Sequence, residues 1–367
     1  DIAGKKHSPR RGRGPACGRR RRDVAGKKTM PTNVTPEYKK AEAAYKRARE
    51  PGERLELLKE MLRAIPKHKG TEHLQAEIKT KIKELTEELA GPKKTGARGG
   101  PPTVIKPDGG GQIVLLGAPN SGKSSLHAAV TGSHSTAGPY PFTTQFPQPG
   151  MVDVDDIAIQ LVDLPAISSE HPVPWIANAV QQADGALLVV DVSHPGCVAE
   201  VVDLLDLLAQ RKIRLIGTWP HGNERANDPD DPFTIVLPTL IVAAKADLVD
   251  DMKAEVDALC DLAELAFPSL AVSTFTQGGC DALGPWLFDA LGVVRVYTKI
   301  PGKPADLGRP YTVRHGDTVG DVALLVHKDF VRGLRFARLW TRGEAGGGRQ
   351  VGRDFVVGDG DVLELHA

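Results

Sequence analysis

The feature that most constrains this chain is the segment of residues 111–125, GQIVLLGAPNSGKSS. Residues 113–116 form the short apolar run expected of a buried strand, and the residues from Ser125 onward are compatible with a helix. Between them stands G-x-x-x-x-G-K-[ST], the pattern of a loop that wraps a phosphate group. Because strand, loop and helix follow one another, we predict a phosphate loop at residues 117–124 and prefer it to a chance glycine-rich turn.

Each residue type in this loop has a physical role. Gly117 and Gly122 let the backbone turn so that successive N–H groups point at the β-phosphate, and the following helix adds the positive end of its dipole. We expect Lys123 to neutralise β- and γ-phosphate oxygens, and the Ser124 hydroxyl to complete the shell of a Mg²⁺ ion. The other nucleotide-binding residues predicted in this segment are Asn120, Ser121 and Ser125.

Composition indicates a soluble globular protein. The 367 residues suffice for two or three domains, and 41% are apolar and 25% charged. The four cysteines are scattered without a C-x-x-C pair, which supports neither a disulfide framework nor a zinc site and favours a reducing compartment. Apolar runs such as residues 186–190 are far too short to span a bilayer. We therefore expect a cytoplasmic protein without a membrane partner.

The net charge of +1 hides an uneven distribution. Residues 1–30 carry 11 Lys/Arg and 2 Asp, a balance of +9, so the remainder carries 36 Lys/Arg and 44 Asp/Glu, a balance of −8. Residues 1–34 lack apolar periodicity, which predicts a disordered basic segment. Three interpretations stay open: a basic arm that touches nucleic acid, an organellar targeting segment, or residues 1–29 that are not native. We favour the third, because the chain starts with Asp while Met30 precedes the first helical pattern.

Residues 35–90 have the pattern of helices. Thr35-Pro36 is a typical helix start, Pro51-Gly52 interrupts the run, and a further helix begins at Thr71. That last helix carries one apolar stripe, formed by Leu74, Ile78, Ile82, Leu85 and Leu89. We predict an antiparallel helical hairpin at residues 35–90, with a solvated spacer as the alternative, and then a Pro/Gly linker at residues 91–110.

Two further units follow. Across residues 111–291 strands alternate with helices, which predicts an α/β domain whose parallel sheet is covered on both faces. Strands are expected at residues 112–116, 151–154, 157–162, 185–190, 237–243 and 270–273, and helices at 122–130, 173–181, 198–210, 251–266 and 281–291. Residues 292–367 change to strand, strand, helix, strand, strand, a small α+β module in which Thr318 and Asp321 are a candidate capping box.

Four segments after the phosphate loop resemble, in chain order, further motifs of the Obg/DRG group of P-loop GTPases. Residues 138–144, GPYPFTT, resemble the first switch, in which a threonine joins Mg²⁺ when the γ-phosphate is present; we prefer Thr144 to Thr143. The segment that begins Asp163-Leu-Pro165-Ala166 resembles the second switch, whose aspartate holds Mg²⁺ through water. Lys245-Ala-Asp247 resembles the guanine motif N-K-x-D, and Ser273-Thr274 resembles the guanine loop.

The resemblance extends beyond these motifs. Residues 292–367 are similar to the TGS domain, a β-grasp module that ends the DRG proteins, and residues 67–74 are similar to the helical hairpin that begins them. Over residues 35–367 the resemblance implies a protein that binds GTP or GDP, hydrolyses GTP slowly with Mg²⁺, and associates with a ribosome or other RNA. No DNA specificity is evident. Candidate RNA contacts, with a solvated basic rim as the equal alternative, are Arg314, His315, Lys328, Arg332 and Arg335.

The resemblance also assigns roles to single residues. It implies catalysis by Lys123 and Thr144, and a Mg²⁺ ion held by Ser124, Thr144 and Asp163. Asn120 resembles the asparagine that ligates K⁺ in related GTPases; an asparagine that caps its own turn is the alternative. The nucleotide-binding residues implied beyond the phosphate loop are Asp163, Pro165, Ala166, Lys245, Asp247, Ser273 and Thr274.

Three residues depart from the family pattern. Ala166 replaces a glycine of the second switch, which narrows the freedom of its backbone. Ala244 replaces the asparagine of N-K-x-D, which removes a purine contact and a tie to the phosphate loop. Ile167 stands where many GTPases place a water-orienting glutamine, as is usual in the Obg-like group. Two alternatives therefore remain: a degenerate nucleotide-binding adaptor with little or no hydrolysis, and an ATPase.

Overall fold

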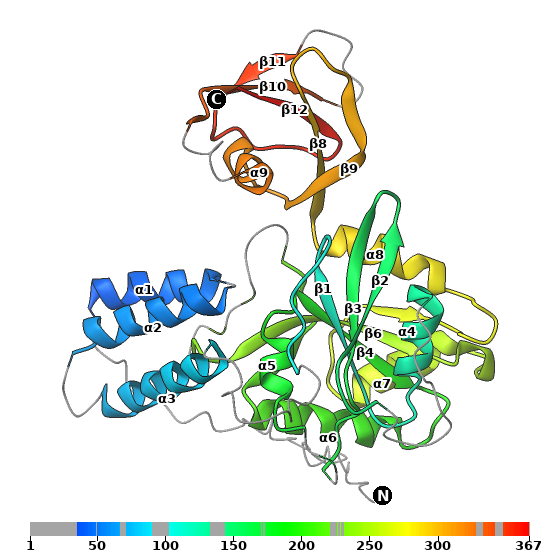
Figure 1. The fold of residues 1–367 in the computed structure, drawn as a ribbon. Coiled ribbons are helices and arrows are strands. Elements are labelled where there is room, and N and C mark those ends of the chain that lie inside the picture. Colours follow the sequence, from blue (N-terminus) through cyan, green and yellow to red (C-terminus); the bar gives the residue numbers. More distant parts are fainter. Residues whose placement is uncertain are drawn as a thin grey trace, which may run out of the picture.

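The computed structural model describes residues 35–48, 50–66, 71–89, 103–132, 144–169, 171, 173–220, 226, 228, 231–327, 333–341 and 348–366. Figure 1 shows a group of helices beside a central α/β part, and a small sheet at the C-terminal end. The predicted disordered segment 1–34 and residues 91–102 of the predicted linker lie outside the described residues.

The N-terminal part holds three helices, α1 (Pro36–Arg47), α2 (Pro51–Ala64) and α3 (Glu72–Leu89), with breaks where the sequence predicts them, at Pro51-Gly52 and before Thr71. All three pack together, so the predicted hairpin of two helices describes only part of this unit. Helix α2 packs against both of the others. The predicted helix start is confirmed, because the Thr35 hydroxyl accepts a hydrogen bond from the backbone N–H of Tyr38 at 3.2 Å. Of the predicted stripe, Ile78 and Leu85 are buried, whereas Leu89 is 48% exposed.

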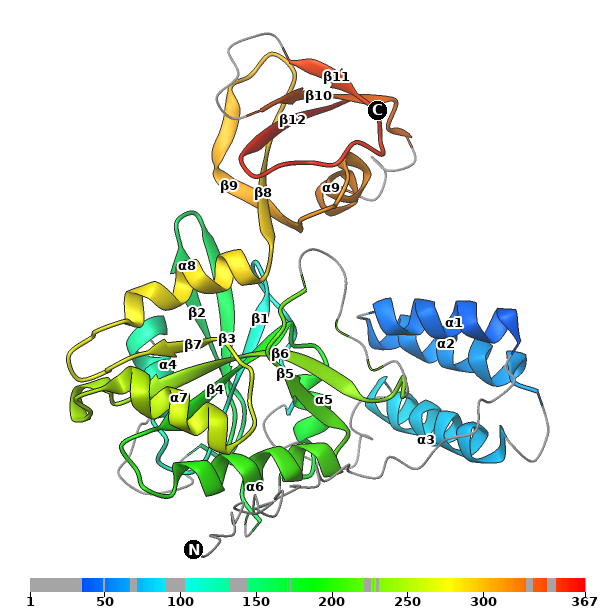
Figure 2. The ribbon, with the colours of Figure 1, turned by 180° about the vertical axis from the view of Figure 1, so that it is seen from behind.

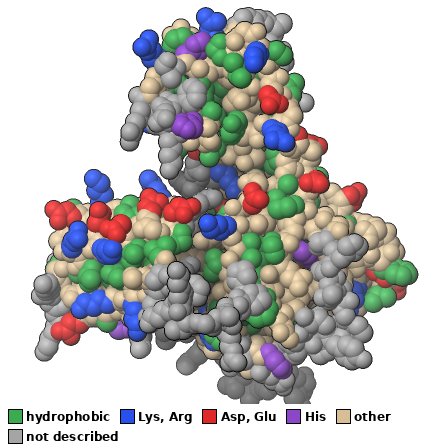
Figure 3. Space-filling model, in the orientation of Figure 1, with side chains coloured by type: hydrophobic (Ala, Val, Ile, Leu, Met, Phe, Trp, Pro, Cys, Tyr) green, Lys and Arg blue, Asp and Glu red, His purple; other side chains and the backbone are tan. Residues whose placement is uncertain are grey.

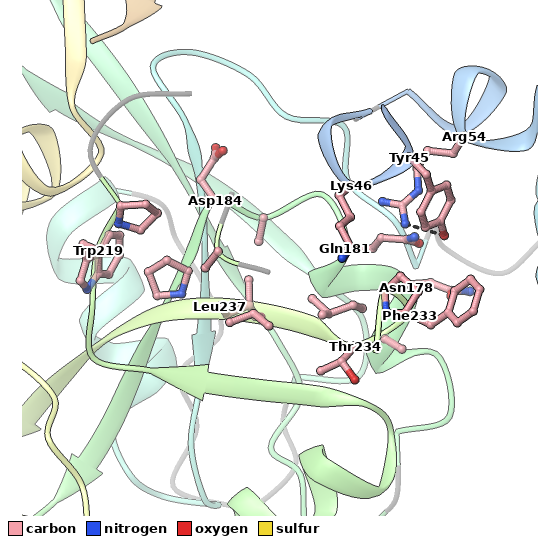
Figure 4. Close-up of a pocket in the computed structure, with 18 of the residues that line it drawn as sticks. Tyr45, Lys46, Arg54, Asn178, Gln181, Asp184, Trp219, Phe233, Thr234 and Leu237 are labelled. Atoms are coloured by element: carbon pink, nitrogen blue, oxygen red, sulfur yellow. Dashed lines mark hydrogen bonds between the residues drawn. The ribbon is translucent and has the colours of Figure 1, made fainter. Parts of the chain in front are cut away.

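A phenylalanine from the central part completes the core of these helices. Phe233, 6% exposed, packs edge-on against the ring of Tyr45, with ring centroids 6.1 Å apart. The guanidinium carbon of Arg54 lies 4.4 Å from the centroid of the Tyr45 ring. Nη2 of Arg54 donates a hydrogen bond to the Tyr45 hydroxyl at 2.8 Å (Figure 4). The amide oxygen of Gln181, turned toward Arg54, accepts from Nη2 at 2.9 Å. The buried ring of Phe233, which we call the aromatic anchor, and the hydrogen bond between Arg54 and Gln181 therefore hold the helices to the central part.

The central sheet has the strand order β2-β3-β1-β4-β6-β5, with β7 also paired to β6. Its strands are β1 (Gln112–Leu116), β2 (Gln148–Val154), β3 (Ile157–Asp163), β4 (Gly185–Asp191), β5 (Ile213–Ile216), β6 (Ile235–Ala244) and β7 (Ser269–Ala271). The prediction of a parallel sheet is right except at one edge, where β2 runs antiparallel to β3. The two strands are joined by Asp155 and Asp156 alone, and so short a connection permits only an antiparallel pair.

Helices cover both faces of this sheet, as predicted (Figure 2). They are α4 (Lys123–Thr131), α5 (Ile176–Val180), α6 (Cys197–Gln210), α7 (Met252–Leu262) and α8 (Cys280–Ala290). Alternate residues of β1 enter two separate cores: Val114 and Leu116 pack with α5, α6 and α7, whereas Ile113 and Leu115 pack with α4 and α8. Helix α7 ends four residues before the prediction, close to Glu264, whose φ of 55° is left-handed.

The C-terminal part is a second sheet, with the order β11-β10-β12-β8-β9. Its elements are β8 (Val293–Lys299), β9 (Ala305–Arg314), α9 (Val319–Val326), β10 (Phe336–Trp340), β11 (Arg349–Val351) and β12 (Asp361–His366). The predicted capping box of α9 is confirmed: the Asp321 carboxylate accepts from the Thr318 backbone N–H at 2.8 Å. The three-residue strand β11 was not predicted.

Two arginines join this sheet to the central part. Arg295 of β8 pairs with Asp155 at 3.2 Å and with Asp156 at 3.1 Å, in the turn between β2 and β3. Arg314 of β9 pairs with Asp184 at 3.2 Å, and both side chains are at most 10% exposed. Arg314 is therefore wrong as a candidate RNA contact.

The aromatic anchor gives a first prediction. Phe233→Ala removes a buried ring, which we expect to weaken docking of the helices by about 2 kcal/mol. Limited proteolysis followed by mass spectrometry should then release a fragment carrying α1–α3 faster than from the unaltered chain. Phe275→Ala is the control, because that ring is 88% exposed. Equal rates for the two variants would show that Phe233 does not hold the helices.

Candidate nucleotide-binding site

The predicted phosphate loop lies between β1 and α4, in the strand–loop–helix order that its sequence requires. Gly122 has a φ of 98°, and Asn120 a φ of 61°. Gly117 must be glycine for a steric reason, since a Cβ there would lie 2.4 Å from the backbone oxygen of Val189 on β4. The loop is thus held close against the neighbouring strand.

Lys123 is folded beneath this loop. Its side chain is buried, and Nζ donates hydrogen bonds to the backbone oxygens of Gly117 at 3.0 Å and Ala118 at 2.9 Å. Burial lowers the pKa of Lys123 to about 8, although the charge of Asp163 acts in the opposite direction. The ammonium therefore occupies the concave side of the loop and is available to a phosphate oxygen.

Three oxygens that the sequence assigned to a metal lie together. The Ser124 hydroxyl donates to Oδ2 of Asp163 at 2.6 Å, and the Thr144 hydroxyl donates to the same oxygen at 3.2 Å. The hydroxyl oxygens of Ser124 and Thr144 are 3.1 Å apart. The other carboxylate oxygen, Oδ1 of Asp163, is buried and has no hydrogen-bond partner among the described residues. A hard cation that prefers oxygen ligands, such as Mg²⁺, fits this donor set and would give the buried oxygen a partner, directly or through water.

The second-switch segment enters the core directly after Asp163. Leu164 and Ile167 both belong to the apolar core formed with α5, α6 and α7, and Pro165 and Ala166 are buried between them. Ile167 is only 6% exposed, so its side chain packs rather than faces a water molecule. Thr144 is the described residue of the predicted first switch; residues 138–143, Thr143 included, lie outside the described residues.

The predicted guanine motif follows β6. Lys245 has a left-handed backbone, with φ 57° and ψ 40°, and begins a 3₁₀ helix at Ala246–Leu248. The Ser273 hydroxyl, after β7, donates to Oδ1 of Asp247 at 2.5 Å. The backbone oxygen of Thr274 accepts from Gln277 at 2.7 Å. Ala244 puts its Cβ 3.5 Å from the place where a Cβ on Gly122 would stand, so a methyl group meets the phosphate loop where the family has an amide.

The structure brings these segments to one edge of the sheet, at the carboxyl ends of β1, β3, β6 and β7. It also shows a residue that the sequence analysis missed. Asp191, the last residue of β4, receives Lys245 Nζ on Oδ2 at 2.5 Å and the Ser193 hydroxyl on Oδ1 at 2.6 Å. Burial raises the pKa of Asp191, but these hydrogen bonds outweigh burial and hold the pKa below its usual range. An apolar strand ending in Asp-x-Ser was the available signal.

Comparison with known proteins points the same way. The family described as "50S ribosome-binding GTPase" matches residues 112–218, and the TGS domain family matches residues 294–367. The chain therefore carries a GTPase domain followed by a TGS domain, and its relatives are named GTP-binding proteins and developmentally-regulated G-proteins. The strand order of its sheet and the separate C-terminal sheet fit this assignment.

Relatives match most of the chain. An uncharacterized GTP-binding protein of Halobacterium salinarum is 28% identical, over 86% of this chain and 98% of its own length. Developmentally-regulated G-protein 1 of Arabidopsis thaliana is 26% identical, over 85% of this chain and 90% of its own. Among solved structures, a GTP binding protein from Pyrococcus horikoshii OT3 matches 70% of this chain and 99% of its own, with 16% identity and a TM-score of 0.45. Among the described residues of this GTPase, no helix has the length and apolarity needed to cross a membrane.

The buried ammonium makes stability depend on pH. In the nucleotide-free chain the pKa of Lys123 is about 8, whereas an unfolded lysine titrates near 10.5. Between these values the unfolded chain binds more protons, so the free energy of unfolding rises with pH, by on the order of 3 kcal/mol over the window. Urea denaturation at pH 7.5–10.5 should show a smaller rise for Lys123→Met than for the unaltered chain. Lys253→Met is the control, because that side chain is 89% exposed; equal slopes in all three proteins would contradict the assigned burial.

Proposed function

We propose that the chain binds GTP and GDP with Mg²⁺ and hydrolyses GTP slowly. The observation that carries this proposal is the cluster of Ser124, Thr144 and Asp163, whose oxygens meet beside the phosphate loop. Within the part of the chain that the structure describes, the buried Oδ1 of Asp163 has no hydrogen-bond partner. When bound, Mg²⁺ would neutralise charge on the β- and γ-phosphates. Asn120, left-handed at the crest of the loop, is the residue we propose for a K⁺ ion.

Base selection is assigned to Asp247. A carboxylate can accept hydrogen bonds from both N1–H and the 2-amino group of guanine, and adenine has neither donor. Ser273 holds Oδ1 of this carboxylate from the adjacent loop and thereby orients it. We therefore propose guanine over adenine, which argues against the ATPase alternative. Ser125, Ser121 and the loop amides would complete the grip on the phosphates.

Hydrolysis in this site depends on positioning and charge rather than on a side chain that activates water. Lys123 and the loop amides would stabilise the transferring phosphoryl group, and Thr144 would be among the residues that hold Mg²⁺. Ile167 is packed in the core, and Ala166 restricts the backbone that must approach the γ-phosphate. These two residues are the reason we propose a slow rate, and with Ala244 they favour the second candidate function, a nucleotide-binding adaptor that does not hydrolyse.

We propose a ribosome or other RNA as the partner and the cytoplasm as the location. The support is the arrangement of parts: α1–α3 and the TGS sheet flank the GTPase part (Figure 1), and the matching family is described as ribosome-binding. Charges of both signs are interspersed over the helical part in Figure 3, so its electrostatics do not single out a phosphate-binding face in that view. The cysteines of the described part, Cys197, Cys260 and Cys280, are free thiols, as a reducing compartment favours. We further propose domain limits at residues 35–90, 111–291 and 292–367, joined by the linker 91–110.

Single-turnover hydrolysis tests the function. With Mg²⁺ and K⁺, the chain should release phosphate from bound GTP above the uncatalysed rate, and Lys123→Ala should abolish the release. Lys253→Ala, at an exposed position, should leave the rate unchanged. Tight GTP binding without release would establish the adaptor instead.

Base selection gives a sharper prediction. Asp247→Asn replaces one acceptor oxygen by an amino donor, which repels the N1–H and 2-amino group of guanine but suits the 2-oxo group of xanthine. We expect GDP affinity to fall about a hundredfold and the xanthine nucleotide to bind better than GDP. Competition of a fluorescent nucleotide by GDP, XDP and ADP measures this, with Asp250→Asn, three residues away and exposed, as control. Unchanged preference for GDP would refute the role of Asp247.

A further inference from the structure

Asp191 lies beside the guanine motif but belongs to none of the motifs that the resemblance assigned. It ends β4, and the register of β4 on β6 pairs it with Ala244, the residue before Lys245. Its Oδ2 accepts from Lys245 Nζ at 2.5 Å. An ion pair thus crosses from β4 to the guanine motif at the position where the motif lacks its asparagine.

The guanine motif has Ala244 in place of its asparagine, so position 244 has no side-chain donor or acceptor that could bond to the phosphate loop. Ala244 is buried, and its methyl group lies 3.5 Å from the place where a Cβ on Gly122 would stand. The backbone at Lys245 is left-handed, a conformation that is unfavourable for a non-glycine residue and persists only where its surroundings hold it. On its far side the motif is fixed, because the Ala246 N–H donates to the backbone oxygen of Val272 at 3.0 Å.

Asp191 is placed and oriented to supply the missing tie. Its Oδ1 accepts from both the N–H of Ser193 at 3.1 Å and the hydroxyl of Ser193 at 2.6 Å, so the carboxylate is held before Lys245 reaches it. Its side chain is only 13% exposed, which strengthens the pair relative to one on the surface. Asp191 also lines a small cavity behind the phosphate loop together with Gly117, Ala118 and Ser121. One carboxylate therefore contacts the guanine motif and borders the phosphate loop.

We propose that Asp191 is a positioning residue for the guanine nucleotide, which fixes Lys245 at the base end of the site and replaces the tie that N-K-x-D makes through asparagine. The inference rests on the proposed function. Asp191 acts through Lys245 and not on the phosphates, so replacing it should weaken binding of the nucleoside part of the ligand. The affinity for inorganic triphosphate, which has no base, should not change when Asp191 is replaced.

A double-mutant cycle on the full chain tests this. Asp191→Ala and Lys245→Ala should each weaken GDP binding about tenfold, as expected for a charged hydrogen bond, and the double variant should lose no more than either alone. Competition by inorganic triphosphate should be unchanged in Asp191→Ala. Asp203→Ala, exposed on α6, is the matched control and should bind like the unaltered chain.

A rescue separates positioning from mere support of the fold. Adding Ala244→Asn to Asp191→Ala restores an asparagine tie and should recover a large part of the lost GDP affinity, whereas a general loss of stability would not be repaired. Asp191→Asn keeps the shape and the Ser193 hydrogen bonds on Oδ1 but turns an amino donor toward Lys245 Nζ, so it should lose as much GDP affinity as Asp191→Ala. Additive losses in the cycle, or GDP affinity of Asp191→Ala within twofold of the unaltered chain, overturn the inference alone. Absence of GDP binding by the unaltered chain overturns the proposed function and this inference with it.

Discussion

The site depends on how closely the phosphate loop approaches β4. Gly117 lies so near the backbone of Val189 that no side chain fits between them, and this contact fixes where the loop leaves β1. The same approach sets Lys123 beneath the loop, where carbonyl oxygens receive its ammonium. Burying a charge is unfavourable unless it is hydrogen-bonded, so the loop and the lysine stabilise each other. A triphosphate would take over the hydrogen bonds that the loop carbonyls now make.

The flanking parts attach to the central sheet at its opposite edge, the amino ends of the strands, and leave the carboxyl edge to the candidate site. Asp184, one residue before β4, accepts a hydrogen bond from the N–H of Gln112 at the start of β1 and pairs with Arg314 of the terminal sheet. Arg295 of that sheet contacts the turn that joins β2 to β3, and β3 ends at Asp163. The terminal sheet thus contacts the amino ends of β1, β3 and β4, at the edge of the sheet opposite the candidate nucleotide site. The helices α1–α3 are attached separately, through Phe233 beside β6.

The sequence predicted those parts of the fold that local patterns control. The phosphate loop has glycine at its two constrained turns, the capping box of α9 is a contact between Thr318 and Asp321, and long apolar runs form the central strands. What it missed depends on contacts between distant segments. Strand β5 has four residues and is defined by its pairing with β6, and Asp191 acquires a role only because β4 lies in register with β6. The packing of the N-terminal helices likewise involves Phe233, which lies more than 140 residues from α3 along the chain.

The most direct test of the account is a calorimetric titration of GDP, with Mg²⁺, into the unaltered chain and into Lys123→Ala. The account predicts that one GDP binds per chain and that Lys123→Ala does not bind GDP. Without Mg²⁺ the unaltered chain should still bind GDP, but with reduced affinity. If Lys123→Ala binds GDP as tightly as the unaltered chain, the loop at residues 117–124 is not the nucleotide site and the account is wrong.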